Sequence, residues 1–167
     1  MPRLLRYPKW RMLYRVAGMP MIWLSRFPAV KDVFQRLMSN SHAAVYRLSR
    51  GSVGASFGAP ALLITVPGRK TGQPRTTPVY YFQHEDSYVV AGSYAGDHRA
   101  PQWFLNVMAA QSATVQVGHD TLSVTARVAT DGEKRTLWPQ MVAMWPGFAD
   151  YQRNTERDIP LVLLSPS

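Results

Sequence analysis

The chain has 167 residues, of which 46% are hydrophobic and 17% charged, a composition typical of one folded globular domain. It contains no cysteine, which excludes disulfide bonds and thiolate metal sites, and its four histidines are too scattered to predict a metal site. The net charge of +9 lies in the first third: residues 1–50 hold ten Lys and Arg and one acid, whereas residues 51–167 hold nine of each. The neutral balance after residue 50 argues against a nucleic-acid-binding core.

Residues 1–50 are predicted to form a basic amphipathic arm, followed by one domain at residues 51–167. In the arm, cations alternate with Trp, Met, Leu and Phe side chains. The uncharged stretch between Arg15 and Arg26 is too short to span a bilayer. The pattern favours peripheral contact of residues 1–28 with an anionic membrane surface. A helix packed on the domain, with its cations in water, is the alternative.

From residue 61 onward, short apolar runs separated by turns predict a β-rich domain. Strands are expected at 61–66, 75–83, 87–93, 113–117, 122–128 and 159–164, and helical segments at 102–110, 131–144 and 148–153. Asp131 is the expected N-cap of the second helix. Sequential strands with peripheral helices predict an α+β protein with a six-stranded, mainly antiparallel, barrel-like sheet.

A basic turn, residues 68–78, joins the first two predicted strands with the sequence GRKTGQPRTTP. Its three cations, Arg69, Lys70 and Arg75, lie among glycine and proline residues that favour a tight turn. Exposed backbone N–H groups and clustered cations suit a phosphate or carboxylate ligand. The spacing is not that of a phosphate-binding Walker A loop. A basic turn that only improves solubility explains the same residues equally well.

Two further segments have features of a ligand site. The small residues at 91–96 would let a backbone approach a flat ring, although the motif is weak. Trp145, Phe148 and Tyr151 lie three residues apart and share one helix face, as either core or ligand wall. The sequence contains no evident nucleophile–base pair or carboxylate dyad, which favours chemistry carried by a cofactor.

Together, residues 68–78, Ala91-Gly-Ser93 and the PQWFLN sequence at 101–106 resemble the deazaflavin-dependent nitroreductase family of actinobacteria. Residues 138–152 and 158–162 extend the resemblance, which covers about residues 30–165. It implies a split β-barrel like that of FMN-binding proteins, and the cofactor coenzyme F-420, an 8-hydroxy-5-deazaflavin with an acidic tail. It also implies hydride transfer to quinones or nitro compounds, in a cytoplasmic protein at the inner face of the cell membrane.

The resemblance implies a position for each part of the coenzyme and acceptor. Residues implied to hold the acidic tail are Arg69, Lys70, Thr71 and Arg75. Residues implied to line the ring are Thr76, Thr77, Pro78, Val79, Tyr80, Ala91, Gly92, Ser93 and Tyr94, with Gln102, Trp103, Phe104, Leu105 and Asn106 on the other side. Residues implied to form the acceptor pocket are Tyr80, Ser93, Trp145, Phe148 and Tyr151. Tyr151, Ser93 or water would supply a proton.

The chain departs from the family pattern at three positions. Tyr94 stands where the family often has lysine, which removes one cation from the tail site. Trp145 and Phe148 replace two tyrosines, so we expect an apolar pocket that suits a menaquinone-like quinone better than a nitroimidazole. Two alternatives remain: an FMN-dependent oxidoreductase of the same fold, and a non-catalytic carrier of coenzyme or lipid. Three clustered cations exceed the need of a single phosphate and favour the deazaflavin.

Overall fold

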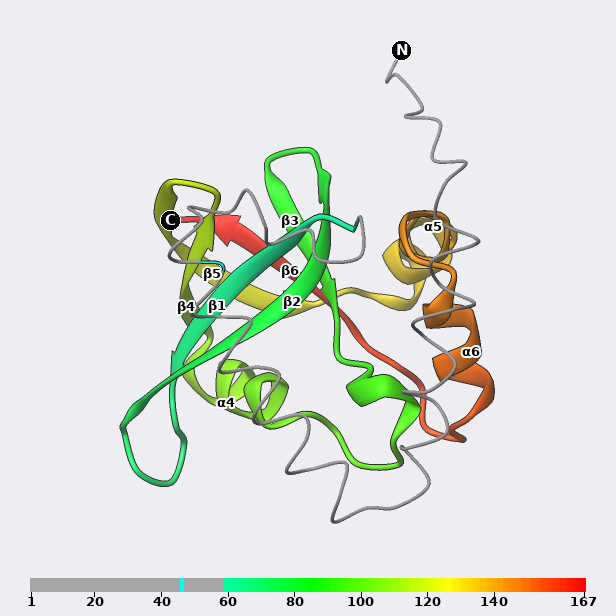
Figure 1. The fold of residues 1–167 in the computed structure, drawn as a ribbon, viewed down its shortest axis with the longest axis horizontal. Helices are drawn as coiled ribbons and strands as arrows, with labels where there is room; N and C mark the ends of the chain where they lie inside the picture. The colour runs from blue at the N-terminus through cyan, green and yellow to red at the C-terminus, as the bar shows by residue number, and fades with distance from the viewer. Residues whose placement is uncertain (1–45, 47–58) are drawn as a thin grey trace.

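A computed structural model describes Tyr46 and residues 59–167, and the rest of the predicted basic arm lies outside the described residues. The described chain folds as a closed antiparallel barrel with the strand order β1-β2-β3-β6-β5-β4 (Figure 1). The strands are β1 (Ala61–Pro67), β2 (Pro74–His84), β3 (Ser87–Ala91), β4 (Ser112–Val117), β5 (Asp120–Val128) and β6 (Leu161–Pro166). The helical elements are η2 (Tyr94–Gly96), α4 (Gln102–Ala110), α5 (Asp131–Met144) and α6 (Gly147–Arg153). The predicted six-stranded antiparallel barrel is confirmed.

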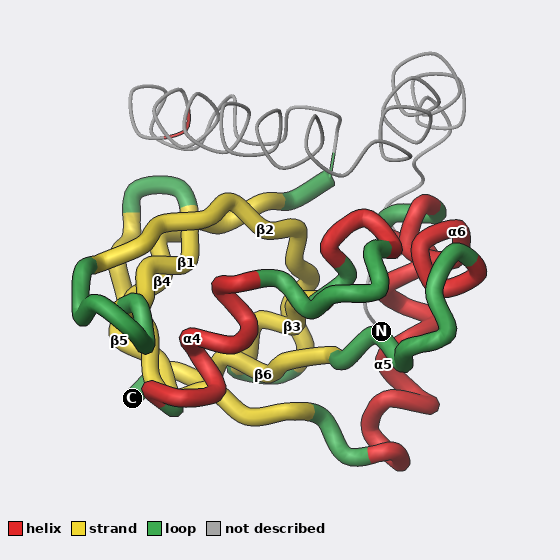
Figure 2. Tube along the Cα trace, turned by 90° about the horizontal axis from the view of Figure 1, so that it is seen from below, coloured by secondary structure: helices red, strands yellow, loops and turns green. Residues whose placement is uncertain are grey.

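Alternating apolar residues fill the barrel interior, because successive side chains of a strand point to opposite faces. Leu62, Ile64 and Val66 of β1 pack there with inward residues of the other strands. Helix α4 lies across one end of the barrel (Figure 2) and adds Trp103 and Val107 to this cluster. The helix therefore closes the barrel with its own apolar face.

A second apolar cluster lies on the outer face of β3 and β6, where α5 and α6 cover the sheet. Leu137 and Met141 of α5 pack against Val89 of β3 and Leu163 of β6. The chain breaks at Pro146, as the sequence predicts, and Gly147 begins α6, which runs in a new direction beside the barrel (Figure 2). This layer contains the aromatic residues of interest.

Several predicted boundaries are wrong by one or two residues: the strand expected at 159–164 spans Leu161–Pro166, and the strand expected at 122–128 begins at Asp120. Strand β3 ends at Ala91 instead of residue 93, because the chain leaves the β2 ladder and forms the η2 turn. The N-cap of α5 is Thr130, not Asp131. The Thr130 side chain accepts from the Glu133 N–H, and the Glu133 carboxylate accepts from the Thr130 N–H, which together form a capping box.

The Glu133 carboxylate also binds Arg127 through two hydrogen bonds, of 2.8 Å and 2.6 Å. The hydrogen bonds from Arg127 and then from Thr130 lower the pKa of Glu133 from 4.5 to about 2. A lowered native pKa stabilises the fold above the unfolded-state pKa, and this stabilisation is lost as the pH falls from 4.5 towards 2. We therefore expect Glu133→Gln to be less stable at pH 7 and to show a weaker loss of stability over that acid range.

Chemical denaturation of wild type and Glu133→Gln between pH 7 and pH 2 tests this prediction. Glu156→Gln is the matched control, since it removes an exposed carboxylate elsewhere on the domain. Parallel pH dependences for wild type and Glu133→Gln would show that the capping carboxylate is not linked to folding.

Candidate functional site

The basic turn between β1 and β2 is held by its own backbone. The Gly68 N–H donates to the Gln73 carbonyl at 2.8 Å, and the Gly72 N–H donates to the Gly68 carbonyl at 2.7 Å. Gly72 adopts a φ of +68°, a conformation that favours glycine. Lys70 and Arg75 are exposed, and neither side chain forms a hydrogen bond or ion pair with another described residue. Their cationic groups are therefore available to a ligand.

Arg69 differs from the other two cations because α4 holds it. Its Nη1 donates to Gln102 Oε1 at 2.9 Å and to Asn106 Oδ1 at 3.1 Å, and its backbone N–H donates to the same Asn106 oxygen at 3.2 Å. Asn106 is buried, with 6% exposure. Arg69 therefore fixes the basic turn beside the amino end of α4, where backbone N–H groups also favour an anion.

The β2–β3 ladder is broken where the basic turn continues into β2. Residues 74–80 of β2 pair with β1 along one edge, but the pairing of β2 with β3 begins only at Tyr81↔Val90. No strand of the described chain pairs with the other edge of residues 74–80. Proline suits such an edge because it has no N–H to donate, and Pro78 occupies its middle. We call this break in the ladder the split.

The predicted ring-lining residues of β2 do not share one face. Thr77 and Val79 pair with the inward residues Ile64 and Leu62, so their side chains face the barrel interior. Thr76, Pro78 and Tyr80 lie on the outer face. A ligand at this strand would meet side chains only from the outer set, and would meet the others through backbone atoms.

The loop after β3 follows the point where the β2–β3 ladder ends, and it is tightly packed. A side chain at Gly92 would meet Pro160 at 3.1 Å and Phe104 at 3.5 Å, so this glycine makes room for protein instead of a ligand ring. Tyr94 and Ala95 adopt φ values of 49° and 52°, which non-glycine residues rarely do. Such strain persists only where the surroundings impose it.

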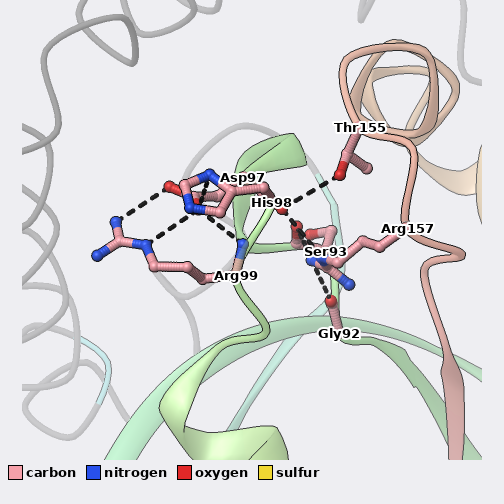
Figure 3. A network of polar contacts seen from close by, with 7 residues as sticks. All are labelled: Gly92, Ser93, Asp97, His98, Arg99, Thr155 and Arg157. Atoms are coloured by element: carbon pink, nitrogen blue, oxygen red, sulfur yellow. Dashed lines mark hydrogen bonds and ion pairs between the residues drawn. The ribbon is translucent and has the colours of Figure 1, made fainter.

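Arg157 contacts this loop from the segment before β6 (Figure 3). Its Nη2 donates to the carbonyls of Gly92 at 2.9 Å and Ser93 at 2.6 Å, and its Nε donates to the Asp97 carbonyl at 2.9 Å. Burial lowers the pKa of Arg157, and the charges of Asp97 and Asp158 oppose this shift. The guanidinium therefore bonds three carbonyls of one short loop.

The four aromatic residues of the predicted acceptor pocket form one cluster, which does not include the fifth predicted residue, Ser93. The rings of Tyr80 and Trp145 lie 5.3 Å apart, and those of Phe148 and Tyr151 lie edge to face at 5.8 Å. Trp145, Phe148 and Tyr151 are buried, while Tyr80 is half-buried. Burial raises the pKa of Tyr80 to about 12, with a smaller contribution from Tyr151. Burial also raises the pKa of Tyr151, against a hydrogen-bonding contact with Trp145. Both phenols therefore stay protonated at neutral pH.

The remaining predicted residues are divided between surface and core. Gln102 is exposed, Phe104 and Leu105 are half-buried, and Trp103 lies in the barrel core with 7% exposure. The contact of Trp103 with a coenzyme therefore stays a prediction. Ser93 is half-buried at the split, and its hydroxyl has no hydrogen bond within the described residues.

Sequence reasoning missed Arg157 and Arg99. The Arg99 guanidinium lies 5.6 Å from the centre of the Tyr94 ring and also pairs with Asp97, so a cation does approach the position where the family often has lysine. The only sequence signal for Arg157 was its place directly before Asp158-Ile-Pro160.

Within the described residues, no helix is long and apolar enough to cross a membrane.

A closed antiparallel barrel whose β2–β3 ladder is broken beside a basic turn defines this chain as a split-barrel protein. The family of F-420H(2)-dependent quinone reductases matches residues 38–166. A curated F-420H(2)-dependent quinone reductase of Mycobacterium tuberculosis is 35% identical over 149 residues, covering 86% of this chain and 95% of its own. The chain belongs to the F-420H(2)-dependent quinone reductase family.

Solved structures agree with this assignment. A structure of an F-420-H2-dependent reductase, FDR-A, matches with a TM-score of 0.59 and 33% identity, covering 64% of this chain and 94% of that one. The haem storage protein HutZ of Vibrio cholerae matches with a TM-score of 0.52 at 13% identity, covering 74% of this chain and 89% of its own. At that identity the second similarity shows the fold alone.

Proposed function

We propose that the protein reduces a quinone with reduced coenzyme F-420, which supplies a hydride when bound. Family membership supports this reaction. The observation that supports it in this chain is the pair of exposed cations, Lys70 and Arg75, whose side chains have no partner among the described residues and lie on a turn closed by its own backbone hydrogen bonds. The chain's own task is then to bind the coenzyme, align it with the acceptor and exclude water.

The donor set of the basic turn fits the acidic tail of this coenzyme. Lys70 and Arg75 would bind its phosphate and carboxylates, while Arg69 would add its charge from a position fixed by α4. Thr71, whose Oγ1 lies 3.4 Å from the Gln73 N–H, would add a hydroxyl. A single phosphate, as in FMN, would leave part of this charge unused.

The split is the proposed place for the ring. The outward side chains of Thr76, Pro78 and Tyr80 form one side, and Ser93 and Tyr94 the other. Pro78 keeps the ladder from closing, and the half-buried Ser93 hydroxyl would be an available hydrogen-bonding group. Gly92 contributes its backbone only, since Pro160 and Phe104 occupy its side-chain space.

The aromatic cluster of Tyr80, Trp145, Phe148 and Tyr151 is the proposed acceptor wall. The buried indole ring of Trp145 and the buried phenyl ring of Phe148 favour a bulky apolar quinone over a polar nitro compound. Tyr151 would hold a proton near the acceptor because its raised pKa keeps the phenol protonated. Ser93 or water are the other candidate donors for the same proton.

Oxidation of reduced coenzyme F-420, followed by absorbance, tests this function directly. We expect turnover with menaquinone analogues and at least tenfold lower kcat/KM with nitroimidazoles, since one or two lost apolar contacts change specificity by about this factor. Binding of F-420 without turnover of any quinone would favour the carrier instead. Tight binding of FMN and none of F-420 would contradict the proposed cofactor.

We also propose that the protein works at the inner face of the cell membrane, where its quinone would be dissolved. Support comes from the sequence of residues 1–28, in which cations alternate with large apolar side chains. Deletion of residues 1–28 is expected to abolish sedimentation with anionic liposomes and to leave turnover of a water-soluble quinone unchanged. Equal liposome binding by both forms would contradict this location.

A further inference from the structure

We propose that Arg157 is a positioning residue that holds the loop of residues 92–97 apart from β2 and thereby places Ser93 at the split. Its guanidinium donates to the carbonyls of Gly92, Ser93 and Asp97, and it reaches all three from outside the loop (Figure 3). The inference rests on the proposed function only in taking this loop as a wall of the coenzyme site.

The strand register explains why the Ser93 carbonyl needs an outside donor. If the pairing Tyr81↔Val90 continued, Ser93 would face Pro78, which has no N–H to offer. On the other edge of the strand, the Gly92 N–H donates to the Pro160 carbonyl at 2.9 Å and continues the β3–β6 register, so the chain stays with β6 where it leaves β2. Arg157 then supplies the hydrogen bond that β2 cannot give, and the ladder stays open.

The strained turn that follows needs the same support. Tyr94 and Ala95 both have positive φ, a strained conformation for residues other than glycine that persists only where the surroundings impose it. Hydrogen bonds from a charged donor are among the stronger ones in proteins. Arg157 donates to the Ser93 carbonyl, which precedes this turn, and to the Asp97 carbonyl, which follows it. The guanidinium therefore bridges the strained segment.

Arg157 therefore connects two parts of the proposed site. It lies six residues after Tyr151, beyond the end of α6, and the Thr155 hydroxyl between them also reaches the Asp97 carbonyl at 3.5 Å. One short segment therefore contains the phenol of Tyr151 on the acceptor side and the guanidinium that bonds the loop of residues 92–97 on the coenzyme side. This connection holds the two proposed walls at a fixed distance from each other. Loss of the guanidinium should release the loop while the barrel remains folded.

Hydrogen–deuterium exchange of the coenzyme-free protein tests the inference without any turnover. Arg157→Ala is expected to speed exchange in residues 92–97 about tenfold, with little change in the barrel strands. It should also weaken binding of reduced F-420 about tenfold, and added guanidinium ion should restore both properties where sodium chloride does not. Arg153→Ala is the matched control, because among the described residues Arg153 pairs only with Asp150 on the surface of α6.

Exchange and affinity equal to those of Arg153→Ala would overturn the inference, as would rescue by sodium chloride. If Arg157→Ala does not fold, Arg157→Lys replaces it: a single amine cannot reach three carbonyls, so we expect faster exchange of residues 92–97. Wild-type exchange and affinity in Arg157→Lys would overturn the inference equally. A wild-type protein that does not bind F-420 would contradict the proposed function, while the exchange result would still decide the role of Arg157.

Discussion

Replacing both available cations of the basic turn, in the variant Lys70→Gln/Arg75→Gln, is expected to weaken binding of reduced coenzyme F-420 about 100-fold. A hydrogen bond to a charged group contributes about 1.5–3 kcal/mol, and each 1.4 kcal/mol is a tenfold change in affinity. Both side chains are exposed and have no partner in the described chain, so the fold should be unaffected. Titration of the coenzyme, with a melting curve for each protein, measures both effects.

The control for this variant is Arg135→Gln/Arg153→Gln, which removes the same charge from α5 and α6. It should bind the coenzyme within about threefold of wild type, because charges more than about 10 Å away are screened at physiological salt. The affinity of wild type should also fall more steeply with salt than that of Lys70→Gln/Arg75→Gln. Equal weakening in both double variants would mean that overall charge, not the basic turn, attracts the coenzyme.

Arg69 is left in place in this test because its role is mixed. It is bonded to Gln102 and Asn106, and Asn106 is buried. Removing Arg69 would leave a buried carbonyl oxygen with fewer donors and would loosen the turn from α4. The three cations that look equivalent in the sequence therefore differ in the structure: one anchors the turn, and two are available to the ligand.

The fold could be predicted from the sequence because its signals are local. Apolar runs ended by turn residues marked the six strands, and helices α4 and α5 begin and end where their apolar patterns and prolines predicted. The N-cap of α5 was placed one residue late, because Thr130 and Asp131 are both good capping residues and only the contact with Glu133 separates them. Residues 1–45 and 47–58 lie outside this comparison.

The site was predictable only where it is contiguous in the sequence. The turn at 68–78 and the spacing of Phe148 and Tyr151 were evident, but Arg157 bonds a loop more than sixty residues away, which no local pattern reveals. The sequence also did not predict on which face of the sheet each β2 side chain lies. Thr77 and Val79 turn inward only because β1 pairs with β2 in the observed register. Long-range pairing decides these points, and the family resemblance named residues without giving their orientation.

Gly96→Ala should have the largest effect on stability of any single substitution in the loop at the split. Gly96 has a φ of +77°, and a side chain there would lie 2.8 Å from the Tyr151 carbonyl oxygen and 3.0 Å from its Cα. Both are backbone atoms of α6, so neither can move aside without moving the helix. We expect a loss of about 3 kcal/mol, combining the cost of the conformation with displacement of α6.

Gly118→Ala separates these two causes. Gly118 also has a positive φ, of 61°, but nothing lies within 4 Å of a side chain there, so only the conformational cost of about 1 kcal/mol should appear. Urea unfolding of both variants gives the difference, which is the cost of pushing α6 away from the loop. The same displacement moves Tyr151, so Gly96→Ala should lose quinone turnover at temperatures where it is still folded, whereas Gly118→Ala should keep it. Equal stability and turnover in the two variants would show that the loop and α6 tolerate separation, and that their close contact does not place the acceptor wall.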